Sequence, residues 1–154
     1  MSVTTVETFT CTGCGHRFEA VDLPTACPKC RIHGSARTFP SDRTLTTARQ
    51  NDSFRAGMVV GGCPLPGTVV VTSGIRDRGG DFVTSAILAA AFDTAFSEDN
   101  DPWGSRDFGT VTVQGEKLYW KIDYYDANRE YGSDDPTDPA KTHRVLTLLF
   151  PSEY

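Results

Sequence analysis

The sequence predicts an α+β protein, with a small cysteine-rich module over about residues 1–40 and an antiparallel sheet packed against a helix over residues 41–154. Three observations carry this prediction. Two Cys-x-x-Cys pairs stand near the N-terminus. Apolar and polar residues alternate over residues 117–125, as in a strand with one buried face. Residues 82–96 place alanine and phenylalanine at helical spacing. A chain of 154 residues has room for one ordinary domain, or for one small domain plus a metal-stapled module.

The cysteine pairs read Cys11-Thr-Gly-Cys14 and Cys27-Pro-Lys-Cys30. Each pair predicts a tight turn that aims two thiolates at one point, and two such turns complete a tetrahedron of sulfur. This spacing favours a metal ion over two disulfides. Four cysteines leave no open coordination position, so we expect the metal to stabilise the module rather than to catalyse a reaction.

The same residues resemble the rubredoxin-like zinc-ribbon family, especially the short form at the end of rubrerythrins. The resemblance rests on the two cysteine pairs, on Gly15 and His16 after the first pair, and on Phe39. The sequence differs at Arg31, where that family usually has glycine. The resemblance implies zinc or iron, since each accepts four thiolates. No Glu-x-x-His motif of a di-iron domain is present, so we favour one structural zinc ion over iron.

Residues 41–57 are predicted to form a helix that Ser41 or Asp42 caps and Gly57 ends. A turn-rich connector over 58–67 follows, and it contains Cys63, the odd cysteine, which we expect to be a buried free thiol.

A strand is predicted over 68–72 and a loop over 73–80, with Asp81 as the N-cap of the helix at 82–96. The residues expected to face the core from that helix are Phe82, Ala86, Ala89, Phe92 and Phe96. Further strands are expected near residues 107–113, 117–125 and 144–150, and together with 68–72 they should form the sheet.

Two acidic loops are predicted, at residues 98–107 and 126–138. They lie in the part of the chain from residue 61 onward, which holds fifteen of the twenty acidic residues but only eight of the fifteen basic ones. Such a surface repels phosphates and can attract a basic surface on another protein. The candidate partner-binding residues are Asp99, Asp101, Trp103, Asp107, Asp123, Tyr125, Asp126, Tyr131, Asp134, Asp135 and Asp138.

From about Leu45 to Tyr154 the chain resembles the bacterial family called domain of unknown function 3768. The strings that carry the resemblance are Asn51-Asp-Ser-Phe-Arg55, Asn100-Asp-Pro-Trp-Gly104, Asp107-Phe-Gly109, Trp120-Lys-Ile-Asp-Tyr-Tyr-Asp126, Tyr131-Gly-Ser133, Asp135-Pro-Thr-Asp-Pro139, Arg144-Val-Leu-Thr147 and Glu153-Tyr154. The family usually has histidine where this chain has Arg106. The resemblance implies a setting of plasmids, phages and their proteobacterial hosts, and it implies no mechanism.

Three functional hypotheses follow, and the first is a non-enzymatic binding protein. Its acidic surface would dock on a host or phage protein, for example as an inhibitor of a defence nuclease of the anti-CRISPR or anti-restriction type. An acidic surface can occupy a groove that expects phosphates.

The two alternatives use other residues. In a metal-dependent phosphoester enzyme, the acidic loops would hold a divalent ion. In a nucleic-acid binding protein, basic residues of the cysteine module would contact phosphates. The aspartates of the first alternative are Asp99, Asp101, Asp107, Asp123 and Asp126, and the basic residues of the second are Arg17, Lys29, Arg31 and Arg37.

The location is predicted from what the sequence lacks. No apolar run approaches the roughly 20 residues that a membrane helix needs. No secretory signal is visible at the start of the chain. We therefore expect a cytoplasmic protein that does not insert into a membrane.

Overall fold

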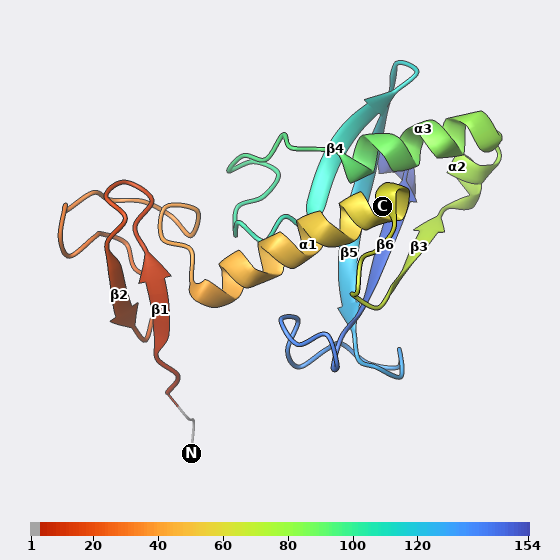
Figure 1. The fold of residues 1–154 in the computed structure, drawn as a ribbon. Helices are drawn as coiled ribbons and strands as arrows, with labels where there is room; N and C mark the ends of the chain where they lie inside the picture. Colours follow the sequence, from red (N-terminus) through yellow and green to blue (C-terminus); the bar gives the residue numbers. More distant parts are fainter. Residues whose placement is uncertain (1–3) are drawn as a thin grey trace.

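The computed structural model describes residues 4–154 and contains two separate sheets (Figure 1). Strands β1 (Glu7–Thr10) and β2 (Arg17–Ala20) form an antiparallel hairpin at one end of the molecule. This hairpin and the loops after it, through Pro40, are called the ribbon here. Helix α1 (Asp42–Val60) leads from the ribbon to a four-stranded sheet. The α+β class expected from the sequence is confirmed.

The larger sheet has the strand order β3-β6-β5-β4. Its strands are β3 (Gly67–Val71), β4 (Phe108–Val113), β5 (Glu116–Tyr125) and β6 (His143–Leu149). Strands β4, β5 and β6 form an antiparallel meander, but β3 runs parallel to β6, so the sheet is mixed rather than wholly antiparallel. This follows from the connection after β3, which crosses to the opposite edge of the sheet before β4 starts. The meander then returns toward β3, and its last strand, β6, runs in the same direction as β3.

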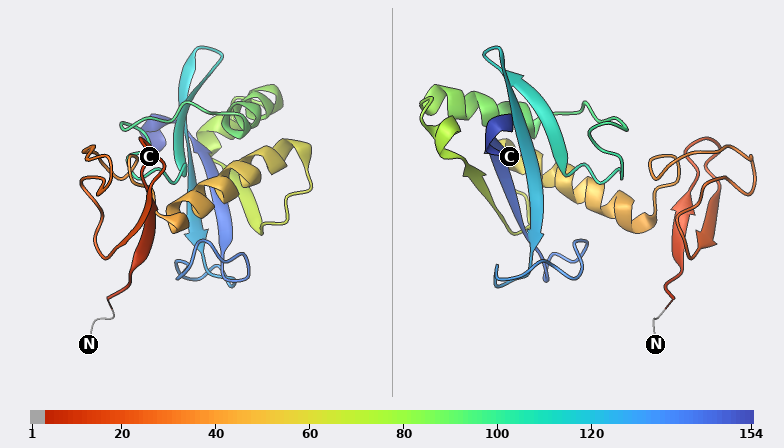
Figure 2. Two further views of the ribbon diagram at one scale, coloured as in Figure 1. Left: turned by 60° about the vertical axis from the view of Figure 1, so that its left-hand side comes forward. Right: turned by 180° about the vertical axis from the view of Figure 1, so that it is seen from behind.

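That connection consists of two helices, α2 (Ser73–Arg76) and α3 (Gly80–Ala91). Helices α1 and α3 contact each other and cover one face of the sheet (Figure 2). Phe54 of α1, Phe82 of α3 and Trp120 of β5 belong to one buried core between these layers. A short 3-10 helix, η1 (Pro151–Glu153), ends the chain.

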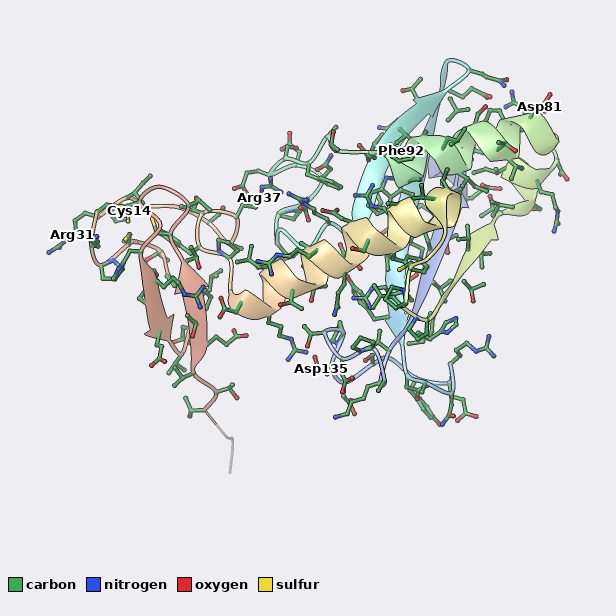
Figure 3. All side chains as sticks on the ribbon, in the orientation of Figure 1. Cys14, Arg31, Arg37, Asp81, Phe92 and Asp135 are labelled. Carbon is green, nitrogen blue, oxygen red and sulfur yellow. The ribbon has the colours of Figure 1, made fainter. Side chains whose placement is uncertain are left out.

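The helix boundaries differ from the sequence prediction in four places. Helix α1 does not end at Gly57 but continues to Val60, with Gly61 as its C-cap. The expected loop over 73–80 contains α2. Helix α3 starts after Gly79, whose φ is 96°, so Asp81 lies in the first turn and not at the N-cap. The helix also ends at Ala91, which leaves Phe92 59% exposed (Figure 3), so its expected place in the core is wrong. Phe96 still contacts the core, edge-to-face with the ring of Trp120.

The ribbon has its own small core, made by Phe9, Phe39 and the two buried cysteines. It joins α1 directly, because Phe9 forms a β-bridge with Ser41. The side chain of Ser41 accepts a hydrogen bond from the N–H of Thr44 and so caps the helix, as predicted. Over residues 4–154, none of the helices has the length and apolar character needed to cross a membrane.

Candidate functional site

The four cysteines of the two pairs converge at the tip of the ribbon. The Sγ atoms of Cys11 and Cys30 are 3.8 Å apart, those of Cys14 and Cys27 are 3.7 Å apart, and all four lie within 4.8 Å of one another. A tetrahedral ion with metal–sulfur bonds of about 2.3 Å places its sulfurs about 3.8 Å apart. The cluster can therefore hold one metal ion. The two histidines that stand close to the cysteine pairs in the sequence, His16 and His33, do not belong to this cluster.

The cluster is built from two copies of the same turn. In the first, the N–H of Gly15 donates to the carbonyl of Cys11 (2.8 Å); in the second, the N–H of Arg31 donates to the carbonyl of Cys27 (3.0 Å). The residue after each pair has a positive φ, 76° at Gly15 and 68° at Arg31. Glycine adopts this backbone freely, whereas a residue with a Cβ is strained there.

The second turn also stabilises the thiolate form of Cys27. The backbone N–H groups of Lys29 and Cys30 each donate to Cys27 Sγ at 3.4 Å. Burial acts to raise the pKa of the Cys27 thiol, but these hydrogen bonds, together with those from the thiols of Cys30 and Cys14, outweigh it and lower the pKa to about 6. The pKa of the neighbouring Cys30 thiol is raised, to about 11. A thiolate is the form that binds metal, so this backbone favours metal binding at neutral pH.

We predict that Arg31→Gly stabilises the metal-loaded ribbon by up to about 1 kcal/mol, because it removes the strain of a side chain at positive φ. The measurement is the chelator concentration at which the ribbon releases its metal. The control is Lys29→Gly in the same turn, which should destabilise the ribbon because Lys29 is not at positive φ. If Arg31→Gly weakens metal retention as much as Lys29→Gly does, the account of Arg31 is wrong.

The first acidic loop is attached to the ribbon through Asp101, which is only 3% exposed. Its carboxylate pairs with Arg37 (2.8 Å) and accepts the N–H of Arg106 (3.0 Å). Burial raises the pKa of Asp101. In Figure 3, Arg37 lies between the ribbon and this loop. Ser35 adds a hydrogen bond to Glu98. Asp101 thus joins two parts of the protein and is not free for a partner.

The remaining aspartates of the proposed divalent site do not converge. Asp107 faces the helices and accepts a hydrogen bond from the hydroxyl of Tyr124 (3.2 Å), and burial raises the pKa of both groups. Asp123 lies on the opposite face of the sheet, where it pairs with Lys121 at 2.8 Å. In the part of the chain that the structure describes, the cysteine cluster is the only group of three or more such ligands.

A buried polar cluster between α1 and the sheet was missed by the sequence analysis. Asn51, fully buried, donates to the hydroxyl of Tyr124 (2.7 Å) and accepts from Nε of Arg144 (2.9 Å). Arg144, also fully buried, donates to Gln50 (2.9 Å) and to the carbonyl of Pro136 (3.0 Å). The cluster fixes the second acidic loop to α1, because Pro136 belongs to that loop.

Arg55 forms a second buried contact, at the C-terminal end of α3. Its guanidinium donates to the carbonyls of Ala90 (2.7 Å) and Asp93 (2.9 Å) and lies over the ring of Trp120. The indole N–H of Trp120 donates to the carboxylate of Asp93 (2.9 Å). Arg144 was a usable signal, because it places a charged side chain in the mainly apolar strand β6, whereas Asn51 lies among the polar residues of α1 and gave no such signal.

The other candidate residues divide into exposed groups and turn formers. Trp103 is 67% exposed and Tyr131 74% exposed, one on each acidic loop. Asp135 (Figure 3) and Asp138 accept backbone N–H groups inside the second loop, so both shape that loop. The exposed or half-exposed residues that remain are Asp99, Tyr125, Asp126 and Asp134. Cys63 is a half-buried free thiol.

A groove of about 180 Å³ lies between the ribbon and Trp103. Its walls are mainly apolar: Phe9, Leu23, Phe39 and Trp103 line it, with Glu7 at its rim. Leu23 is 46% exposed, so this wall is open to solvent. We call this feature the Trp103 groove. Arg37 and Ser35 hold the loop that carries Trp103 to the ribbon.

A family model described as protein of unknown function (DUF3768) matches residues 71–153, which is more than half of the chain. This chain belongs to the DUF3768 family. The match starts at the end of β3 and includes α3, the meander and both acidic loops. The ribbon and α1 precede the matched part. No curated protein and no solved structure matches this DUF3768 chain.

Proposed function

We propose that this DUF3768 protein is a non-enzymatic binding protein that docks on a protein partner through the Trp103 groove and the acidic loops. The observation that carries the proposal is Trp103 itself. An indole that is 67% exposed, placed over an apolar groove on the same loop as the exposed Asp99, has the form of an interface anchor. The Arg37–Asp101 ion pair holds it in place before binding, which lowers the cost of ordering.

We further propose that the cysteine cluster holds zinc, in a structural role. Four thiolates close the coordination sphere, so the metal would supply folding energy to the ribbon and hold the wall of the Trp103 groove. Cys11 and Cys27 are buried and Cys14 and Cys30 are exposed, so the site lies at the surface. Bound metal, by fixing both turns, would keep Phe39 and Ser41 in place at the start of α1.

The charge of the exposed residues indicates the class of partner. On the ribbon, the basic residues Arg17 and Arg37 are paired with Asp42 and Asp101. Glu7, at the rim, forms no ion pair among the contacts described for residues 4–154. This balance favours a basic surface with an apolar side chain at its centre. The nucleic-acid binding groove of a nuclease is basic because it binds phosphates. The specific form of the proposal is therefore an inhibitor of a host or phage nuclease.

The two alternatives have less support. The phosphoester hypothesis needs carboxylates that converge, and Asp107 and Asp123 lie on opposite faces of the sheet. The nucleic-acid hypothesis needs free basic residues on the ribbon. Arg17 and Arg37 are already paired with aspartates, which leaves Lys29 and Arg31 as the exposed candidates outside the ion pairs of the described residues.

The test is capture of partners from nuclease-treated bacterial lysate by the tagged protein and by Trp103→Ala. We predict that Trp103→Ala weakens capture by about 30-fold, since an anchor residue contributes about 2 kcal/mol or more. The matched control is Phe92→Ala, which removes another exposed aromatic ring from a different part of the molecule and should retain the partner. If Trp103→Ala captures the same protein equally well, the proposal is wrong. Partners that disappear with nuclease treatment would support the nucleic-acid alternative instead.

A further inference from the structure

One edge of the sheet carries an uncharged segment. Residues 56–75 contain no Asp, Glu, Lys, Arg or His, although charged residues make up 23% of the chain. The segment covers the end of α1, the connector and β3. Several of its valines are exposed: Val60 at 76%, Val70 at 42% and Val69 at 36%. Exposed valines in a segment that carries no charge of its own favour a contact surface. The carboxylate of Glu153 accepts hydrogen bonds from Thr72 and Gly74 at the end of the segment, beyond β3.

Strand β3 forms the terminal strand of the sheet at this edge (Figures 1 and 2), and β6 is its only partner in the described part of the chain. The bonds to β6 use alternate residues: the carbonyl of Pro66 accepts from Arg144, and the N–H of Thr72 donates to Leu148. Backbone groups of successive strand residues point in opposite directions. The N–H and C=O groups of Gly67, Val69 and Val71 therefore point out to the open edge.

These open groups are complementary to a second copy of themselves. If two β3 strands pair antiparallel about a two-fold axis at Val69, Gly67 lies opposite Val71 of the second copy, and Val69 lies opposite Val69. Every pair then joins two residues whose backbone groups point outward, so each pair can exchange both of its hydrogen bonds. A shift of the register by one residue would lose this match.

We propose that the protein forms a two-fold dimer through β3, which joins the two sheets into one continuous sheet. Such an interface is isologous: the same segment serves on both copies. The end of α1 lies beside β3, where Phe54, Met58 and Val69 line one groove, so the same contact brings the exposed ends of both α1 helices together.

Charge explains why a second copy fits this edge. The chain carries a net charge of −5, so two copies repel each other wherever their acidic loops meet. The uncharged segment allows them to approach without that repulsion. A basic partner, by contrast, gains nothing from an uncharged edge and is better served by the acidic loops.

The test is the mass of the metal-loaded full chain in solution, measured by light scattering and sedimentation from micromolar to millimolar concentration. The expected result is a concentration-dependent dimer. Val69→Pro should make the protein monomeric with an unchanged circular dichroism spectrum, because proline removes an N–H that points outward and leaves the bonds to β6 intact. A wild-type protein that stays monomeric throughout overturns the proposal.

The matched control is Thr110→Pro at the opposite edge of the sheet. The N–H of Ile122 donates to the carbonyl of Asp107, so by alternation the N–H of Thr110 also points outward, and this variant should remain dimeric. Hydrogen exchange gives a second readout in the wild-type protein. The amides of Val69 and Val71 should become protected as concentration rises, and fast exchange at every concentration overturns the proposal even if Val69→Pro fails to fold.

Discussion

Removal of the metal is expected to unfold the ribbon and to leave the four-stranded sheet folded. The buried core of the ribbon comprises only Phe9, Phe39 and two cysteines, which is too little apolar surface for a stable fold. A structural zinc site of this kind contributes about 10–16 kcal/mol of apparent binding free energy, which becomes folding free energy of the module. Trp120, fully buried in the other core, should keep its emission.

The measurement is the NMR spectrum of the backbone amides, recorded with and without a chelator and also for Cys27→Ser. The amide signals of the ribbon should move to the chemical shifts of an unfolded chain, and the amide signals of β4, β5 and β6 should keep their chemical shifts. Cys63→Ser, which removes the cysteine outside the cluster, is the control and should change neither set. A single cooperative loss of both sets would mean that the ribbon and the sheet form one folding unit.

The same experiment should reach the Trp103 groove. Arg37 and Ser35 of the ribbon hold the first acidic loop through Asp101 and Glu98, so the loop loses these contacts when the ribbon unfolds. Quenching of Trp103 by acrylamide should rise in the metal-free protein. The binding surface that we propose therefore depends on the metal, although no cysteine lines the Trp103 groove.

The second large effect is expected for Arg144→Met, which should destabilise the sheet domain by about 3–5 kcal/mol, because three neutral acceptors lose their hydrogen-bond donor. Arg144 is fully buried, and its guanidinium donates hydrogen bonds to the side chains of Asn51 and Gln50 and to the carbonyl of Pro136. Methionine fills part of the space but leaves these acceptors without a donor, and each unsatisfied buried group costs about 1–3 kcal/mol. A domain of this size has only about 5–15 kcal/mol in total, so most of the stability would be lost.

Denaturant unfolding followed by Trp120 emission measures this effect. The control is Arg43→Met, which removes an arginine whose side chain is 52% exposed and which pairs with Asp135 at 3.7 Å. A surface pair of that kind contributes less than about 1 kcal/mol. Equal unfolding midpoints for the two variants would show that the buried hydrogen bonds of Arg144 contribute no more than a surface ion pair.

Local patterns in the sequence predicted much of this fold. The alternation that ends at Tyr124 identified the inner face of β5, and the two cysteine pairs identified the four-cysteine cluster. The direction of β3 could not be predicted, because it depends on which edge the chain reaches after α3 and not on residues of β3.

The candidate site was predicted less completely. Asp101 and Asp107 look like solvated acids in a loop, yet Arg37 and Tyr124, far along the chain, bring both into contact with the protein interior. Asn51 and Arg144 are 93 residues apart, and a pairing over that separation leaves no periodic signal. Phe92 was misplaced because helical spacing does not reveal where a helix ends.

The length of α1 has a consequence for valency. Its 19 residues span about 28 Å, and the helix carries the ribbon at one end and lies beside β3 at the other. In a dimer paired through β3, the two ribbons would stand at opposite ends, and the two Trp103 grooves would be held at a fixed separation. A symmetric target with matching spacing would be bound at both sites at once, and each attachment would raise the effective concentration of the other.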